Sequence, residues 1–317
     1  MATSCAALAA TLLPGAVTPA NAGDAVYLGW STVLPGWTDE FIPTSDNDCV
    51  AGRPQCLKHT LKELDRVFTE TTQSCSHNAV FALAYMRITQ TYGWSRDIPG
   101  YYQDVPFANH QDAVFARYYT DAYANWKGGN RSAVPKAWLL AFDAGKDRKV
   151  NGTGDLLLGM NAHINRDLPF VLAAVGLVAP DGSSRKPDYA KVEDFLARST
   201  QAMMAEAAQR LDPSLDDAND PLGLAYTTIF QFISGAREAA WRHAEALVSA
   251  PTPEARALVA AEIEASAATA ARGIIATQSY LPPLTSTRSR DNYCAVHKDD
   301  AAPMEYPFGM PTPYGYK

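Results

Sequence analysis

Hydrophobic residues recur every three or four positions over most of the chain after residue 56, which places them on one face of an α-helix. The first such series is Leu57, Leu61, Leu64 and Phe68, and similar patterns predict helices over 76–92, 107–126, 135–142, 155–176, 188–211, 222–249 and 253–278. Alternating apolar and polar residues, the pattern of a half-buried strand, are nearly absent. The sequence therefore predicts an all-α fold, a single domain of about seven to eight helices around a buried central helix.

The segments outside this pattern define the ends of the domain. Residues 1–22 contain an apolar run and the small-residue motif Ala20-Asn21-Ala22, which predict a signal peptide removed on export, although no positive charge precedes the run. The alternative is an N-terminal helix, which Pro14 and Pro19 would break. Residues 23–56 show no sustained period and predict an ordered N-terminal wrap. We expect a helical domain over 23–297 and an irregular Pro/Tyr/Gly-rich tail over 298–317.

The cysteines support export. After loss of Cys5 with the leader, an even number remains, which favours disulfides in a secreted, extracellular protein. The short gap between Cys49 and Cys56 suggests a local bridge, leaving Cys75 for Cys294, while the other two pairings stay open. A zinc cluster would favour a Cys-x-x-Cys pair, and the chain has none.

Composition narrows the classes of partner. Hydrophobic residues make up 47% of the chain, enough for a large core, and the net charge is −7 with no Lys or Arg before Arg53. This balance predicts no nucleic-acid-binding surface, because phosphate affinity comes mainly from clustered cations. The sequence carries no signal for the oligomeric state.

The segment GMNAHINRDLP, residues 159–169, places polar residues inside an apolar run. On a helical wheel His163 and Asp167 lie one turn apart in the apolar stripe, so we expect the helix to be enclosed by others. It is not expected to cross a membrane, because His, Arg and Asp at its centre would be costly in lipid. Pro169 predicts a kink that frees carbonyls near Asn165.

Three interpretations of this pair stay open. In the first, Asp167 accepts a hydrogen bond from His163 and the two form a satisfied pair in the core. In the second, an imidazole nitrogen and a carboxylate oxygen bind one metal ion. In the third, Asp167 orients His163 as a general base that activates water or a hydroxyl group.

Other polar residues are candidates to join the pair. His110 shares a helix face with Val114, Arg117 and Asp121, and it is the favoured second site residue. Asp112 lies on the other face with Phe115. There it would complement the helix dipole in an exposed first turn. Tyrosines cluster near His110, over 101–102 and 118–123, and would suit a sugar or a lipid head group, or simply a helical core.

His77 opens a helix beside Cys75, where it would serve as a neutral ligand, a base or a cap. Arg237 and Trp241 belong to a charged turn of the helix. The favoured interpretation is that this turn faces solvent. The alternative is that its inward-facing side chains close a pocket.

Four segments together resemble a bacterial family of unknown function, over most of residues 45–297. They are Asn109-His110-x-Asp112-Ala-Val-Phe-Ala, Ala137-Trp138 with the following Ala141–Ala144, Leu158–Leu168, and Arg237–Glu245. More distantly, the His163/Asp167 pair resembles that of the helical zinc phospholipase C and single-strand nuclease enzymes. The chain lacks their full histidine set and their N-terminal tryptophan. The resemblance implies at most a one- or two-metal site, drawn from His77, His110, His163, Asp167 and one of Asp112, Asp121 and Asp143.

Two functions are expected. The first is a secreted hydrolase, in which His163, Asp167 and His110, with His77, bind a divalent metal such as Zn²⁺ or activate water against an ester or phosphodiester bond. The second is a non-catalytic exported domain that binds a small molecule, a lipid or a polysaccharide in an aromatic pocket.

Overall fold

The computed structural model describes residues 39–218, 224–280 and 286–314, without the side chains of residues 216–230. The predicted signal peptide, residues 1–22, lies outside the described residues. Within these ranges the structure contains isolated bridges but no β-strand, so the all-α prediction is confirmed. The helices are α1 (Gln55–Gln73), α2 (Ala79–Arg96), α3 (Val105–Lys127), α4 (Lys136–Lys146), α5 (Gly152–Met160), α6 (Leu168–Val175), α7 (Lys186–Arg210), α8 (Leu224–Ser249), α9 (Pro253–Thr277) and α10 (Thr287–His297).

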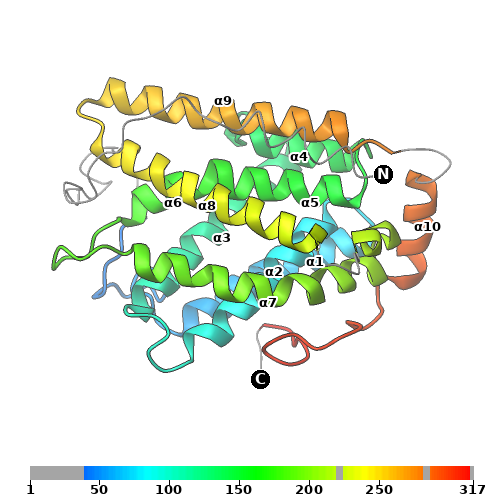
Figure 1. Cartoon of the computed structure of the whole chain (residues 1–317), viewed down its shortest axis with the longest axis horizontal. Helices are drawn as coiled ribbons and strands as arrows, with labels where there is room; N and C mark the ends of the chain where they lie inside the picture. The colour runs from blue at the N-terminus through cyan, green and yellow to red at the C-terminus, as the bar shows by residue number, and fades with distance from the viewer. Residues whose placement is uncertain (1–38, 219–223, 281–285, 315–317) are drawn as a thin grey trace.

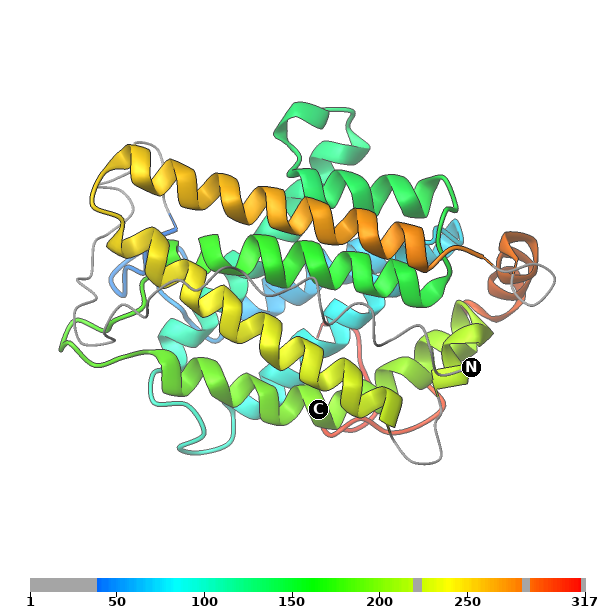
Figure 2. The same ribbon diagram turned by 45° about the horizontal axis from the view of Figure 1, so that its top comes forward.

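The central helix consists of α5, a π-helix over Asn161–Asp167, and α6, which continue directly into one another. The π-helix contacts α3, α4, α8 and α9, and Figures 1 and 2 show α8 and α9 passing along the central helix. Gly159 lets α5 approach α2 closely, because a Cβ there would overlap the ring of Phe81. The prediction of a buried central helix is confirmed: Asn161 and Asp167 are fully buried and His163 is 5% exposed.

The N-terminal wrap, described over residues 39–54, lies against the start of α3. The amide group of Asn109 donates to the carbonyl of Gly52 at 2.9 Å, and the rings of Phe41 and Phe107 meet edge to face. Gly52 has a φ of +65°, and a Cβ there would overlap the carbonyl of Pro106. The wrap can therefore approach α3 this closely only with glycine at position 52.

Both expected disulfides are present. Cys49 is bonded to Cys56 at the junction of the wrap and α1, and Cys75 is bonded to Cys294 of α10. The helix α10 was not predicted, because its sequence has no apolar stripe and only Arg290 and Cys294 are buried. Its position depends on the disulfide and on ion pairs rather than on a hydrophobic face.

Residues 298–314 form turns without a helix and run back along the core. Tyr306 and Phe308 are buried, and the hydroxyl group of Tyr306 donates to Glu206 of α7 at 2.7 Å. Among the helices of the described ranges, none combines the length and apolar composition that a membrane span requires.

Candidate functional site

A cavity of about 430 Å³ lies between α2, α3, α7, α8 and the central helix. Residues of α7 from Asp188 to Met204 border it, a rise of about 24 Å along the helix axis. Exposed Gln103, Asp181 and Ser183 border one end, which is the mouth. The volume lies within the range that small-molecule sites occupy in proteins.

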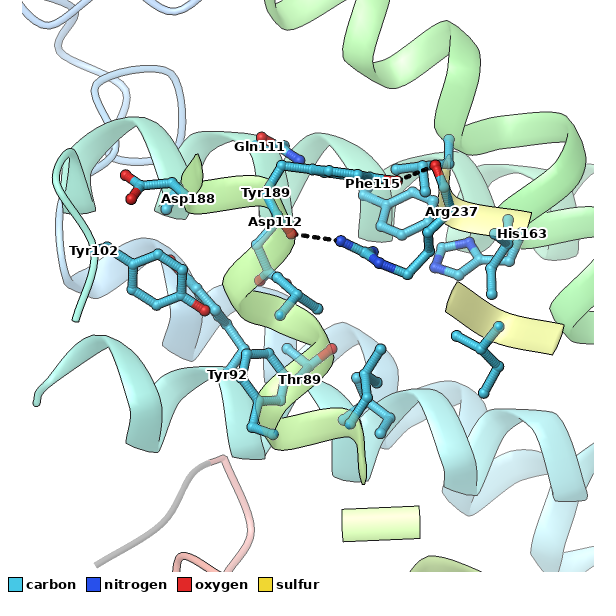
Figure 3. Close-up of a pocket in the computed structure, with 18 of the residues that line it drawn as sticks. Thr89, Tyr92, Tyr102, Gln111, Asp112, Phe115, His163, Asp188, Tyr189 and Arg237 are labelled. Carbon is cyan, nitrogen blue, oxygen red and sulfur yellow. Dashed lines mark hydrogen bonds between the residues drawn. The ribbon is translucent and has the colours of Figure 1, made fainter. Parts of the chain in front are cut away.

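Most of the cavity wall is apolar. The part formed by α5, the middle and end of α7, and α8 carries Leu156, Met160, Phe195, Leu196, Met203, Met204 and Ile233. Methionine side chains are flexible and polarisable, so this wall can adapt to ligands of different shape. Polar side chains lie at the mouth and in a middle section, which we call the polar centre: Tyr85, Thr89, Asp112, His163 and Arg237. Figure 3 shows Thr89, Asp112, His163 and Arg237 of this set.

His163 reaches the polar centre from the π-helix. Its ring stacks on Phe115, with centroids 3.5 Å apart and planes 7° from parallel, and lies 4.2 Å from the ring of Tyr85. Neither Nδ1 nor Nε2 has a hydrogen-bond partner among the described residues. Burial lowers the pKa of His163, with a smaller opposite effect from Asp167, so the imidazole is neutral at pH 7.

Asp167 turns away from His163 to other partners. Its Oδ2 accepts a hydrogen bond from Trp138 Nε1 at 2.7 Å, and its Oδ1 accepts one from Arg166 at 2.9 Å. Nδ1 of His163 lies 4.0 Å from Oδ2, too far for a hydrogen bond. The expected hydrogen-bonded pair is therefore not formed, and Asp167 joins the π-helix to α4 through Trp138.

The π-helix explains how the chain accommodates Pro169. The backbone N–H of Leu168 donates to the carbonyl of His163, five residues earlier, and proline has no N–H to continue an α-helical ladder. The structure thus has a π-turn just before the expected kink. Single π-turns inside α-helices occur often at functional sites, and this one sets the position of His163.

Asp112 lies on the cavity side of α3, which corrects its expected role in an exposed first turn. Its carboxylate makes no hydrogen bond or ion pair with the described residues, and its accessible surface faces the cavity. Burial raises the pKa of Asp112 to about 7, and the charge of Arg96 lowers it by a smaller amount. Phe115, which the sequence places on the same helix face as Asp112, lines the same cavity.

His110 lies away from the cavity, on the face of α3 that the wrap covers. Its Nδ1 and Nε2 lie 2.9 Å from the carbonyl oxygens of Cys49 and Asp39, and burial lowers its pKa. Arg117, on the same face, pairs with the Asp39 carboxylate. The structure therefore does not bring His110 to His163, because the wrap occupies both of its ring nitrogens.

His77 lies in another part of the core, between α2 and α10. Its Nε2 is 3.0 Å from Asp291 and its Nδ1 is 3.2 Å from the hydroxyl group of Tyr280. Burial, together with the charge of Arg290, lowers the pKa of His77 to about 4, although the Asp291 carboxylate acts in the opposite direction.

The remaining candidate metal ligands are also separated. Asp143 pairs with Arg131, and Asp121 lies 4.0 Å from Arg117 on the surface of α3. In the part of the chain that the structure describes, no three His, Cys, Asp or Glu side chains are grouped in a way that would hold a metal ion.

Arg237 is buried in the cavity wall, where it was expected either to face solvent or to close a pocket. One Nη donates to the carbonyl of Tyr189 at 2.6 Å, the guanidinium lies over the Tyr189 ring at 4.1 Å, and its Nε is 3.6 Å from Glu193. Figure 3 shows Arg237 between Tyr189 and His163. Arg237 belongs to α8 and lies one helical turn after Ile233, which lines the same wall.

Unpaired polar atoms are concentrated in this wall. Six buried side-chain atoms of cavity-lining residues have no hydrogen-bond partner in the described protein: Tyr85 OH, Thr89 Oγ1, both ring nitrogens of His163, Arg185 Nε and Arg237 Nε. Buried polar groups in folded proteins are nearly always bonded, so this concentration requires an explanation.

In the part of the chain that the structure describes, the protein is all-α and contains a mainly apolar cavity that opens at one end. The chain belongs to the family described as "Family of unknown function (DUF5995)", whose model matches residues 57–277. The matched region contains the π-helix and all five residues of the polar centre. The search of curated proteins found no similar protein, and the search of solved structures found no similar structure.

Proposed function

We propose that this protein binds an amphiphilic small molecule, with an apolar chain and one polar group, inside the cavity. The observation that carries the proposal is the set of six unpaired polar atoms in an otherwise apolar wall. An unpaired buried polar atom costs about 1–3 kcal/mol. A ligand that offers donors and acceptors at the polar centre recovers part of that cost on binding.

The distribution of polarity favours a lipid-like chain over a polysaccharide. A sugar carries hydroxyl groups along its whole length and needs polar partners along the whole site. Here the apolar part of the wall, formed by α5, the middle and end of α7, and α8, has Thr200 as its polar side chain, and the Thr200 hydroxyl group already donates to the carbonyl of Leu196. An apolar chain would gain about 25 cal/mol for each Å² that it buries there.

Calorimetric titration with 1-decanol tests the proposal, since this neutral chain alcohol requires no particular charge in the site. Ala108 lines the cavity, and Ala113, five residues further along α3, does not, yet both are half-buried. We expect the wild type and Ala113→Trp to bind decanol with a negative heat-capacity change. We expect Ala108→Trp, which fills the cavity, to bind at least about tenfold more weakly.

Thermal unfolding of both variants verifies that they are folded before titration. Absence of decanol binding by the wild type, or equal binding by Ala108→Trp and Ala113→Trp, would refute the proposal.

A hydrolase remains the second candidate, and Asp112 is the observation that favours it. A carboxyl group with a pKa of about 7 can take up and release protons at neutral pH, as a general acid or base must. Hydrolysis of a decanoate ester, assayed with added Zn²⁺ and with chelator, tests this activity and its metal dependence. Activity lost in Asp112→Asn or His163→Ala, with decanol binding retained, supports the hydrolase; no turnover under either condition contradicts it.

A further inference from the structure

The charges that face the cavity are unbalanced toward the negative. Its lining contains four carboxylates, Asp104, Asp112, Asp181 and Asp188, but only two guanidinium groups, Arg185 and Arg237. His163 is neutral because burial lowers its pKa. Field lines in an enclosed, low-dielectric site are focused, so such an imbalance selects ligands by the sign of their charge.

Both arginines have a carboxylate close by, although the Nε atom of each has no hydrogen-bond partner among the described residues. Arg185 forms an ion pair with Asp104 at 2.9 Å and lies over the Phe107 ring. Arg237 donates to the Tyr189 carbonyl and has Glu193 at 3.6 Å. Neither guanidinium therefore presents an uncompensated positive charge to a ligand.

Unlike the two arginines, Asp112 has no oppositely charged partner in the described part of the chain. Its carboxylate lines the cavity and has no hydrogen bond or ion pair with the described residues. Three tyrosines line the cavity beside it, Tyr85, Tyr92 and Tyr102, and the Asp112 charge adds to the effect of burial in raising the pKa of each. A buried carboxylate among aromatic rings is a suitable environment for an ammonium ion, which gains both Coulomb and cation–π attraction.

Carboxylates at the mouth of the cavity add negative charge to that of Asp112. Asp181 and Asp188 border it, and both accept hydrogen bonds from neighbouring N–H groups, which keep their carboxylates in place. The only positive charge at this end of the lining is Arg185, which Asp104 neutralises. A cation is therefore attracted at the entrance as well as at the centre.

We infer that the polar centre recognises an amine or quaternary ammonium group, so that the ligand is a cationic amphiphile held by Asp112 and the surrounding tyrosine rings. This inference rests on the proposed function and adds the charge of the ligand to it. An anionic head group would instead meet Asp112 without a free cation to balance it.

The number of protons released on binding provides a separate test of this inference. Since burial raises the pKa of Asp112 to about 7, the free protein is largely protonated there at pH 6. A cationic ligand favours the carboxylate and releases that proton, whereas a carboxylate ligand favours the protonated form that is already present and releases none. The other titratable or charged groups around Asp112 are Tyr85, Tyr92 and Arg96 of α2, Tyr102, His163, Asp188 and Tyr189 of α7, and Arg237.

The test compares three ligands with the same chain: decyltrimethylammonium, 1-decanol and decanoate. Calorimetry at pH 6 in buffers of different ionisation enthalpy gives the affinity and the number of protons released. We expect the ammonium compound to bind at least about tenfold more tightly than decanol, with release approaching one proton per ligand. We expect decanol to bind without proton exchange.

Two variants on α3 separate the Asp112 charge from the charge of the whole protein. Asp112→Asn is expected to remove both the preference for ammonium over decanol and the proton release. Asp121→Asn, the same change at an exposed position, is expected to leave all three ligands unaffected.

Equal affinity for ammonium and decanol, preference for decanoate, or proton uptake by the wild type would overturn the inference, and these wild-type readouts do not depend on any variant. Failure of decanol itself to bind would instead refute the proposed function.

Discussion

Two polar regions are buried in the same helical core, and they differ in how their polar atoms are paired. At the α10 end, Arg290 forms ion pairs with Asp155 at 2.6 Å and Asp212 at 3.3 Å. His77 joins this cluster through the hydroxyl group of Tyr280, which also accepts a hydrogen bond from Arg290. In the polar centre of the cavity, Asp112 has no partner and His163 has only ring contacts.

The difference distinguishes polar residues that hold the fold together from those that we propose to bind a ligand. The α10 cluster fixes a helix that has no apolar stripe, so its charges find partners within the protein. In the polar centre, Arg237 donates to the Tyr189 carbonyl, but His163 is held by ring contacts alone, and neither residue joins a helix that lacks an apolar stripe to the core. Burial alone therefore does not indicate a site, and neither does a single unpaired atom such as Asp155 Oδ1 of the α10 cluster, whereas six unpaired atoms around one cavity do.

The largest expected effect comes from breaking the α10 cluster. Arg290→Met leaves Asp155 and Asp212 buried without their cation, and we expect a loss of about 3–5 kcal/mol in the free energy of unfolding. Urea unfolding followed by circular dichroism measures it. Arg242→Met, which removes exposed ion pairs to Glu238 and Glu245, is the control and should cost at most about 1 kcal/mol. Equal losses in the two variants would show that the α10 cluster is not a structural anchor.

Asp112→Asn should increase the free energy of unfolding, because Asp112 has no partner to lose. Burial raises its folded-state pKa to about 7, above its unfolded value, so the folded wild type holds a proton that the unfolded chain has lost. Wild-type stability then falls by about 1.4 kcal/mol per pH unit as the pH rises from about 4 to about 7. The variant should lack this contribution and exceed the wild type by more at pH 8 than at pH 5.

Urea unfolding of both proteins at pH 5 and pH 8 gives the difference directly. A variant that is less stable than the wild type at pH 8 would mean that Asp112 has a structural partner after all.

His163→Phe should have the smallest effect. The ring stacks on Phe115 and makes no hydrogen bond, so phenylalanine can keep the contact, with a change below about 1.5 kcal/mol. Asp167→Asn on the same helix removes the charge that pairs with Arg166 and should cost about 1.5–3 kcal/mol. Thermal unfolding compares the two variants, and a larger loss in His163→Phe would show that His163 is a structural polar residue.

Much of the fold could be predicted because it depends on local patterns. The spacing of apolar residues located the long helices, and the short Cys49–Cys56 gap indicated the correct pairing of the disulfides. Pro169 indicated a break in the central helix, which the structure accommodates as a π-helix. By contrast, α10 has no such pattern and follows from contacts with residues more than 130 positions away, such as Asp155.

The site was harder to predict because the decisive contacts are long-range. Both faces of α3 carry aromatic and polar residues, so periodicity could not show that the wrap covers His110 and leaves Asp112 to the cavity. In α2 nearly every position is buried, so Tyr85 and Thr89 could not be distinguished from ordinary core residues. His163 was identified because a histidine within an apolar stripe is unusual, but its lack of a partner appears only in three dimensions.

Methyl NMR of the methionines tests the central claim most directly, because their positions report on where a ligand binds. Met160, Met203 and Met204 line the cavity, Met86 is buried outside its lining, and Met304 and Met310 are exposed. In protein labelled at the methionine methyl carbons, titration with 1-decanol should shift the three cavity signals and leave the other three in place. Shifts confined to Met304 and Met310, or no saturable shift at the three cavity methionines, would contradict the account.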